Sequence, residues 1–243
     1  MRSFIKMLLP ICALALCGVL FLTLSLGSAK RLVKQTDALP KRTPARVLID
    51  AGHGGEDGGA VVGDVLEKEI NLAVTRDVAD LLTVCGFDVA LTRSGDEALS
   101  LEGDDIKKRK YNDMKLRLEL YNSPDVDAVI SIHQNKFSDS ASHGAQVFFS
   151  PNREESEFLA ECLKTAVKEM LQPDNTRECK RAGSEIFLLK NAKNPAVLVE
   201  CGFLSNPAEE GRLLDGTYQK KLAMVLTAGY LTQGDTQEGE SLI

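Results

Sequence analysis

The sequence is poor in tryptophan, in basic charge and in closely spaced cysteines. It contains no Trp in 243 residues, which excludes a carbohydrate-binding platform built from indole rings. Lysine and arginine number 29 against 35 aspartate and glutamate residues, so the formal net charge is −6. We therefore expect no nucleic-acid partner, because binding to a phosphate backbone needs basic surface that displaces counterions.

Cysteine spacing also excludes a zinc-finger type of site. Two of the six cysteines, Cys12 and Cys17, lie in an apolar N-terminal run, and the others are scattered without a CxxC pair. A chain of this length can bury a sizeable core without disulfide bonds. We expect Cys85 and Cys162 to be buried thiols.

Residues 1–29 have the pattern of an export segment. Arg2 and Lys6 precede 20 uncharged residues, 7–26, enough to cross a bilayer as a helix. Small residues at 27–29 provide a cleavage site, so residues 1–29 are either a signal peptide or an uncleaved N-terminal membrane anchor. The bulky Leu16 before Cys17 argues against a lipoprotein signal. Both readings place the body outside the cytoplasm, secreted or membrane-anchored.

The rest of the chain divides into three parts. Residues 30–45 are polar, contain two prolines and predict a linker. Residues 46–232 have the periodicity of one folded domain, and residues 233–243 predict a polar, frayed tail. Taking the two positive charges of residues 1–29 from the net charge of −6 leaves −8 on the remainder.

Strand-like and helix-like patterns alternate through residues 46–232. Periodicity predicts strands at 46–50, 88–93, 128–132, 145–149, 186–189 and 196–199. It predicts helices at 67–84, 111–121 and 154–171, one capped by Asn206-Pro207, and a last one around 222–226. This alternation indicates a single α/β domain with a mostly parallel central sheet flanked by helices on both faces.

Four polar residues stand where these elements begin or end. His53 follows the first strand in the turn DAGHGGEDGG, His133 follows the strand AVISI, and Glu200 closes the strand AVLVE. Glu67 begins the helix after the first strand. The carboxyl ends of parallel strands meet at one crevice, so we expect all four side chains to converge there.

Two imidazoles and one carboxylate are typical of a catalytic zinc site, with water in the fourth position. Zinc would make that water more acidic and polarise a scissile carbonyl. A further carboxylate, Glu200, would take the proton and deliver it to the leaving amine. Glu200 is not expected to be a ligand, because it would then occupy the position that water needs.

Each residue alone also has an ordinary structural interpretation. His53 or His133 could be a hydrogen-bonded loop residue, and Glu67 a common first-turn acid. The glycines of the turn could simply build a tight bend. The turn has neither the G-x-G-x-x-G spacing nor a Walker lysine, so it is not a nucleotide loop.

Together, the motifs VLIDAGHGG, LEKEINLA, SIHQN and AVLVECGFLSN resemble the zinc-dependent N-acetylmuramoyl-L-alanine amidases of the type-3 family, over residues 46–232. The resemblance implies a twisted sheet, one Zn²⁺ per chain held by His53, Glu67 and His133, and Glu200 as the catalytic carboxylate. It implies a peptidoglycan substrate, cut at the amide between the lactyl group of N-acetylmuramic acid and the L-alanine of the stem peptide.

The charged insert GDDIKKRKYND is similar to the spore-cortex, germination-specific branch of this family. That branch implies action in the intermembrane space of the forming spore, with a deacetylase that converts the product to muramic δ-lactam. Arg93, Arg117 and Asn122 also resemble family positions, and we expect them to be structural or groove-lining. His143 and Cys201 match no role in the family.

Two other functions fit parts of the pattern. A cysteine hydrolase would pair Cys201 with His133, but Cys201 and Glu200 point to opposite faces of a strand, and the crevice accepts only one of them. A wall-binding module of the same fold would need no turnover, although the complete ligand set argues against it. A weak zinc site that depends on an activating protein partner is a variant of this alternative.

Overall fold

The computed structural model describes residues 45–240, with side chains described up to residue 233. The export segment at 1–29 and all but the last residue of the linker at 30–45 lie outside the described residues. Within the described part, none of the helices combines the length and apolar character needed to span a membrane.

A six-stranded sheet forms the centre of the domain, in the order β4-β1-β5-β8-β6-β7. Its strands are β1 (Arg46–Ala51), β4 (Asp88–Leu91), β5 (Ala128–Asn135), β6 (Gln146–Phe149), β7 (Lys180–Arg181) and β8 (Ala196–Phe203). The first four in spatial order are mutually parallel, whereas β6 runs antiparallel to β8. A separate short hairpin joins β2 (Val61–Val62) to β3 (Val65–Leu66).

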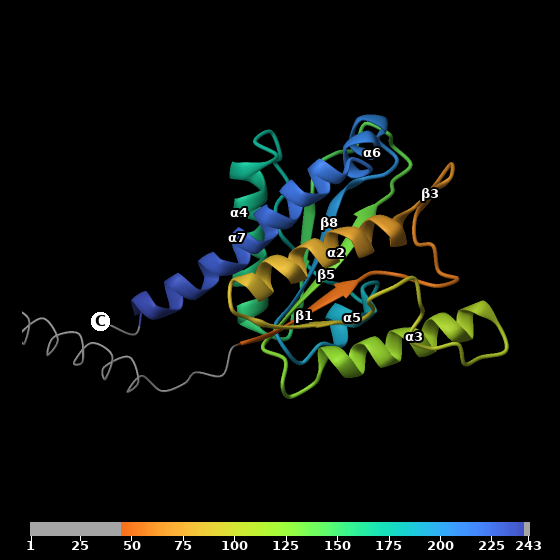
Figure 1. Ribbon diagram of the computed structural model, residues 1–243, viewed down its shortest axis with the longest axis horizontal. Coiled ribbons are helices and arrows are strands. Elements are labelled where there is room, and N and C mark those ends of the chain that lie inside the picture. Colours follow the sequence, from red (N-terminus) through yellow and green to blue (C-terminus); the bar gives the residue numbers. More distant parts are fainter. Residues whose placement is uncertain (1–44, 241–243) are drawn as a thin grey trace, which may run out of the picture. The chain divides into compact units, whose positions relative to one another are not determined.

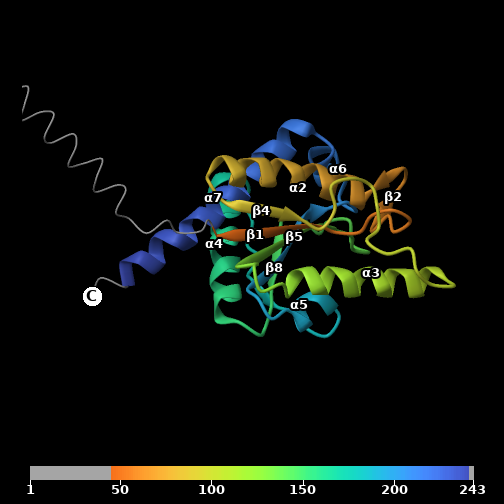
Figure 2. The same cartoon turned by 60° about the horizontal axis from the view of Figure 1, so that its bottom comes forward.

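Helices cover both faces of this sheet (Figures 1 and 2). One face carries α2 (Glu67–Val84), α4 (Glu154–Met170) and α7 (Gly216–Glu240), and the other carries α3 (Ile106–Tyr121) and α5 (Phe187–Asn191). The short α6 (Pro207–Leu213) follows β8 and is capped by Asn206, as expected. The predicted fold, a single α/β domain with a mostly parallel, helix-flanked sheet, is confirmed.

Strand alternation divides the interior into two cores, because successive side chains point to opposite faces of a sheet. Val47 and Ile49 of β1 enter a large core with α2, α4 and α7. Leu48 enters a smaller core, which contains Tyr121 of α3 and Leu189 near the end of α5. The smaller core continues toward the carboxyl ends of the strands, where the polar residues stand.

The charged insert is helical. α3 begins at Ile106, five residues before the predicted Tyr111, and Asp105 caps it by accepting a hydrogen bond from the Lys108 amide at 2.7 Å. The prediction began too late because the first turns have almost no apolar residues to show a helical period. Four consecutive residues, 107–110, are lysine or arginine and form the start of this helix.

Two other expectations from the sequence are wrong, and a third segment differs. Residues 186–189 do not form a strand, and the helix α5 begins at Phe187. The prediction failed because a run of four apolar residues is equally compatible with a strand and with a short buried helix. Cys85 is exposed at the end of α2, where the chain leaves the core, and Cys162 is only partly buried. The segment expected to be a frayed tail continues α7 as far as Glu240.

A buried carboxylate connects three elements below the site. Asp50, at the end of β1, is fully buried and accepts hydrogen bonds from Thr92, Tyr121 and Ser131 at 2.6–2.7 Å. Arg117 of α3 forms a 2.5 Å ion pair with it. Burial alone would raise the pKa of Asp50, but the Arg117 charge and the hydroxyl donors outweigh it and hold the pKa well below its usual range.

We predict that Asp50→Asn lowers the free energy of unfolding by about 3–5 kcal/mol, because the Arg117 charge stays buried without its principal partner. Urea unfolding in the presence of a chelator measures this for the metal-free protein. The exposed Asp125→Asn is the control and should change stability by no more than about 0.5 kcal/mol. Equal stability of the two variants would contradict this role for Asp50.

Candidate metal centre

The loop after β1 brings His53 to the carboxyl edge of the sheet. His53 has φ of 63°, in the left-handed region that non-glycine residues rarely adopt. Just before it, a Cβ on Gly52 would lie 2.3 Å from the His133 ring, so only glycine fits there. The conformation of this loop and the approach of the second histidine are therefore linked.

Two arginines hold the loop through its backbone carbonyls. Arg93 donates to the carbonyls of Ala51 and Gly52, both at 3.0 Å. Arg117 donates to those of Ala51 at 2.8 Å and His53 at 2.6 Å. Both arginines are buried, so they act on the structure of the site and stabilise a strained loop.

His53, Glu67 and His133 converge on one point. His53 Nε2 lies 3.2 Å from Glu67 Oε2, and His133 Nδ1 lies 2.9 Å from Glu67 Oε1. One ligand atom from each residue can be chosen so that all three lie within 4.8 Å of one another. Ligand atoms of a tetrahedral zinc ion, each about 2.0–2.2 Å from the metal, lie roughly 3.3 Å apart. The donor set and its spacing thus fit a divalent metal ion.

Hydrogen bonds from two backbone amides and one side chain orient Glu67. Its Oε2 accepts a hydrogen bond from the Ala60 amide at 2.7 Å, and its Oε1 accepts from the Gln134 amide at 3.0 Å and the Asn71 side chain at 3.1 Å. Burial would raise the pKa of Glu67, but contacts with the two imidazoles outweigh it and hold the pKa far below its usual range. Glu67 is therefore ionised, as a metal ligand must be.

Asp57 orients His53 from the other side of the imidazole ring. The Asp57 carboxylate lies 2.9 Å from His53 Nδ1, which leaves Nε2 facing Glu67. Such carboxylate partners fix the tautomer and direction of a metal-binding histidine. Asp57 is not among the residues expected from the sequence, although its place four residues after His53 in the same turn was a signal. Lys110 of α3 pairs with Asp57 at 2.6 Å.

Glu200 stands beside this group and is not a member of it. It is paired in register with His133 across β5 and β8, so both side chains project from the same face of the sheet. Among the described residues, Glu200 Oε2 is shielded from solvent and has no hydrogen-bond partner. Burial raises the pKa of Glu200 to about 7; the Glu67 charge adds to this shift and the imidazoles oppose it.

Cys201 does not face the centre. It belongs to the large core with Val197 and Val199, on the opposite side of the sheet from Glu200, and is fully buried. Burial also raises the pKa of the thiol well above its usual range. A buried, protonated thiol is not a nucleophile, which argues against a cysteine hydrolase.

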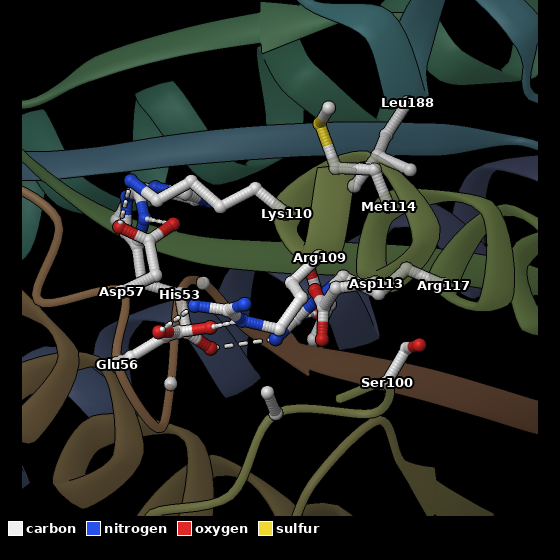
Figure 3. A pocket seen from close by; sticks show the side chains of 15 residues that line it. His53, Glu56, Asp57, Ser100, Arg109, Lys110, Asp113, Met114, Arg117 and Leu188 are labelled. Carbon is white, nitrogen blue, oxygen red and sulfur yellow. Dashed lines mark hydrogen bonds and ion pairs between the residues drawn. The ribbon is translucent and has the colours of Figure 1, made fainter. Parts of the chain in front are cut away.

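A cavity of about 160 Å³ opens on the α3 side of His53 and His133 (Figure 3). Charged residues of the loop and of α3 line it, together with the apolar side chains of Ala98, Met114 and Leu188. His143 lies elsewhere, on a second cavity that it shares with Asp139, Asp174 and Arg177. Asn122 is structural: it caps α3 and accepts a hydrogen bond from the Lys193 amide.

Comparison with known proteins identifies relatives of this domain. The family described as N-acetylmuramoyl-L-alanine amidase, Amidase_3, matches residues 47–230. The germination-specific N-acetylmuramoyl-L-alanine amidase of Bacillus subtilis (strain 168) is 38% identical over 186 residues, which cover 76% of this chain and 78% of the relative.

Two solved structures are also similar. The CwlD amidase of Clostridioides difficile, in complex with the GerS lipoprotein, has a TM-score of 0.72 and 36% identity, covering 77% of this chain and 98% of that one. The catalytic domain of CwlV, from Bacillus (Paenibacillus) polymyxa var. colistinus, has a TM-score of 0.65 and 30% identity, covering 79% and 98%.

We predict that Asp57→Asn weakens binding of a divalent metal by about 10–100-fold, because an amide no longer fixes the His53 tautomer. Competition with a chromogenic chelator measures the affinity. Asp64→Asn, an exposed acid of the β2–β3 turn, is the matched control and should leave the affinity unchanged. Similar affinities for the native protein and Asp57→Asn would show that Asp57 does not orient the ligand.

Proposed function

The chain belongs to the Amidase_3 family of N-acetylmuramoyl-L-alanine amidases, and on this basis we propose how its residues cut peptidoglycan. The bond is the amide between the lactyl group of N-acetylmuramic acid and the L-alanine of the stem peptide. We assign the reaction to one catalytic domain, residues 46–232, with one zinc ion. The observation that carries this proposal is the unpaired Glu200 oxygen beside three convergent metal-binding side chains.

His53, Glu67 and His133 would hold the ion. Their donor set, two imidazoles and one carboxylate, is typical of catalytic zinc and leaves room for water. Bound there, zinc supplies an acidified water and polarises the scissile carbonyl. Asp57 keeps His53 directed at the centre, and the arginine-held loop prevents the histidine from moving away.

Glu200 would move the proton. Its free Oε2 would accept a proton from the attacking water and then donate it to the leaving nitrogen of alanine. Burial raises the pKa of Glu200 above that of an exposed carboxyl, which favours the protonated form that the second half of this task needs. The in-register pairing with His133 keeps this oxygen beside the metal-binding group.

The relatives support a biological setting in the cell wall of the spore. One is named as germination-specific, which supports a role in the spore cortex. In that role a deacetylase would convert the product to muramic δ-lactam. The CwlD amidase was solved with a lipoprotein, which supports a protein partner of that kind. Action on the cell wall supports a location outside the cytoplasm, where the protein would be secreted or held at the membrane of the forming spore by residues 1–29.

A wall-binding module without turnover is the second candidate. It would need the fold and the crevice, but it would not need a buried, unpaired carboxyl oxygen, whose desolvation is costly unless the group has a function. The complete set of four residues therefore favours the enzyme.

We predict that Glu200→Gln lowers the rate of amide cleavage by about 10²–10⁴-fold while zinc remains bound, because only proton transfer is lost. Mass spectrometry of peptidoglycan fragments detects the product, an intact stem peptide with a free alanine amine. Glu69→Gln, an exposed acid on the same helix as Glu67, is the control and should cut normally. Equal release by native protein and Glu200→Gln would remove Glu200 from the mechanism.

We predict that Cys201→Ala keeps cleavage within about threefold of the native rate, because the thiol lies in the core and not in the crevice. Chelation should abolish cleavage in both proteins, and added zinc should restore it. The same peptidoglycan assay, run with and without a thiol reagent, measures these effects. Loss of activity in Cys201→Ala, with the unfolding midpoint unchanged, would instead favour the cysteine mechanism.

A further inference from the structure

We propose that the Lys110 ammonium binds a carboxylate of the stem peptide, so that the peptide lies toward α3 and the glycan strand runs away from it. The inference rests on the proposed amide cleavage and adds a direction and a preference to it. It starts from the cavity beside His53, which α3 closes on one side.

The start of α3 is basic although the chain is acidic. Residues 107–110 are Lys-Lys-Arg-Lys, in a chain with a net charge of −6. Two of these residues, Arg109 and Lys110, line the cavity. These two side chains place positive charge at the rim, where it can contact an anionic group of the substrate.

The acids of the same cavity are already paired. All four of its carboxylates form ion pairs with lining cations: Asp50 and Asp113 with Arg117, Glu56 with Arg109, and Asp57 with Lys110. The Asp50 pair is buried, so its charges contribute little at the rim. Because Asp50 and Asp113 share Arg117, the lining has one carboxylate more than it has lysines and arginines, so an entering carboxylate would be held by direct contact with a cation and not by the net charge of the cavity.

Lys110 retains donors for such a group. Its side chain is 45% exposed, and its ammonium has three N–H donors. Among residues 45–233, Asp57 is its one ion-pair partner, which leaves capacity for a second acceptor. Arg109 differs, because its Nε and Nη2 donate to Glu56 and its Nη1 donates to the Gly103 carbonyl.

Two contacts connect Lys110 to the imidazole ring of His53. Lys110 contacts Asp57, which contacts the His53 ring (Figure 3). The other nitrogen of that ring faces Glu67. A peptide extends by at most about 3.3–3.6 Å per residue, so a carboxylate on the residue after alanine lies within roughly 7 Å of the scissile nitrogen. We place that carboxylate at the rim formed by Lys110, whose ammonium the Asp57 contact holds on the His53 side of the cavity.

The cavity wall also suits the alanine. Met114, one helical turn after Lys110, and Leu188 of α5 line the cavity together with Ala98 (Figure 3). These apolar side chains offer contact for a methyl group between the cut bond and the charged rim. A cation at the rim with an apolar wall behind it matches the order of groups along the peptide, alanine first and carboxylate next.

The experiment compares two synthetic muramoyl dipeptides that differ in one group. Both contain L-alanine followed by D-glutamate whose γ-carboxyl is capped as an amide, with the α-carboxylate free in one and amidated in the other. The measured quantity is the ratio of kcat/KM for the two, at saturating zinc. Because the ratio is internal to each protein, changes in folding or metal content cancel, whereas loss of carboxylate binding does not.

We expect the native protein to prefer the free carboxylate by about 3- to 10-fold, mainly through KM, as for a partly exposed charge-assisted hydrogen bond. Lys110→Met should bring the ratio close to one, and Lys110→Arg should largely keep it. Lys108→Met is the control on the same helix: its ammonium lies near the Tyr111 ring, so removing it should change the ratio by less than about twofold.

Two outcomes overturn the inference. A native ratio near one, with both substrates cut at the amide, would mean that Lys110 only holds the loop. An equal fall of the ratio in Lys110→Met and Lys108→Met would indicate that the positive charge of α3 attracts the substrate non-specifically and that Lys110 does not bind the carboxylate directly. If neither substrate is cut at the amide, the proposed function itself fails, and that result is distinguishable from the other two.

Discussion

The buried pairing of Asp50 with Arg117 connects the parts of the molecule on which the site depends. Asp50 ends the first strand, Arg117 comes from the middle of α3, and the same guanidinium continues to the carbonyl of His53. Strand, helix and ligand loop are therefore fixed to one another by a single cation. The strained conformation of His53 persists because these contacts over-determine it.

Three carboxyl groups near the Asp50–Arg117 pair differ in pKa, although burial alone would raise the pKa of each. Asp50 and Glu67 are held ionised by cations or imidazoles that outweigh desolvation. Glu200 has no such partner, and its pKa rises to about 7. The first carboxylate is structural, the second lies among side chains that could hold a metal ion, and the third has, among the described residues, a shielded oxygen without a hydrogen-bond partner. Local donors and cations, and not residue type, determine the role of each group.

The sequence predicted most of the sheet and the four central residues because both leave strong local patterns. Apolar strands alternate with helices, and His53 follows such a strand, whereas His133 and Glu200 lie inside strands that run further than predicted, to Asn135 and Phe203. What it did not predict depends on contacts between distant segments. The start of α3 is charged and lacks a period, so its helix was placed too late. Four apolar residues at 186–189 fit either state, and packing against α3 decides for a helix. Asp57 and Lys110 become visible only when the loop and α3 meet.

The register between β5 and β8 determines which side chain of β8 lies opposite His133. His133 faces Glu200 directly, and the pairing then shifts by a residue before Asn135 meets Phe203. If β8 shifted by one residue relative to β5, Cys201 would face the crevice and the Glu200 carboxylate would point into the hydrophobic core. The alignment of two neighbouring strands, and not the identity of the side chain alone, thus decides whether an acid or a sulfur atom is presented to the substrate.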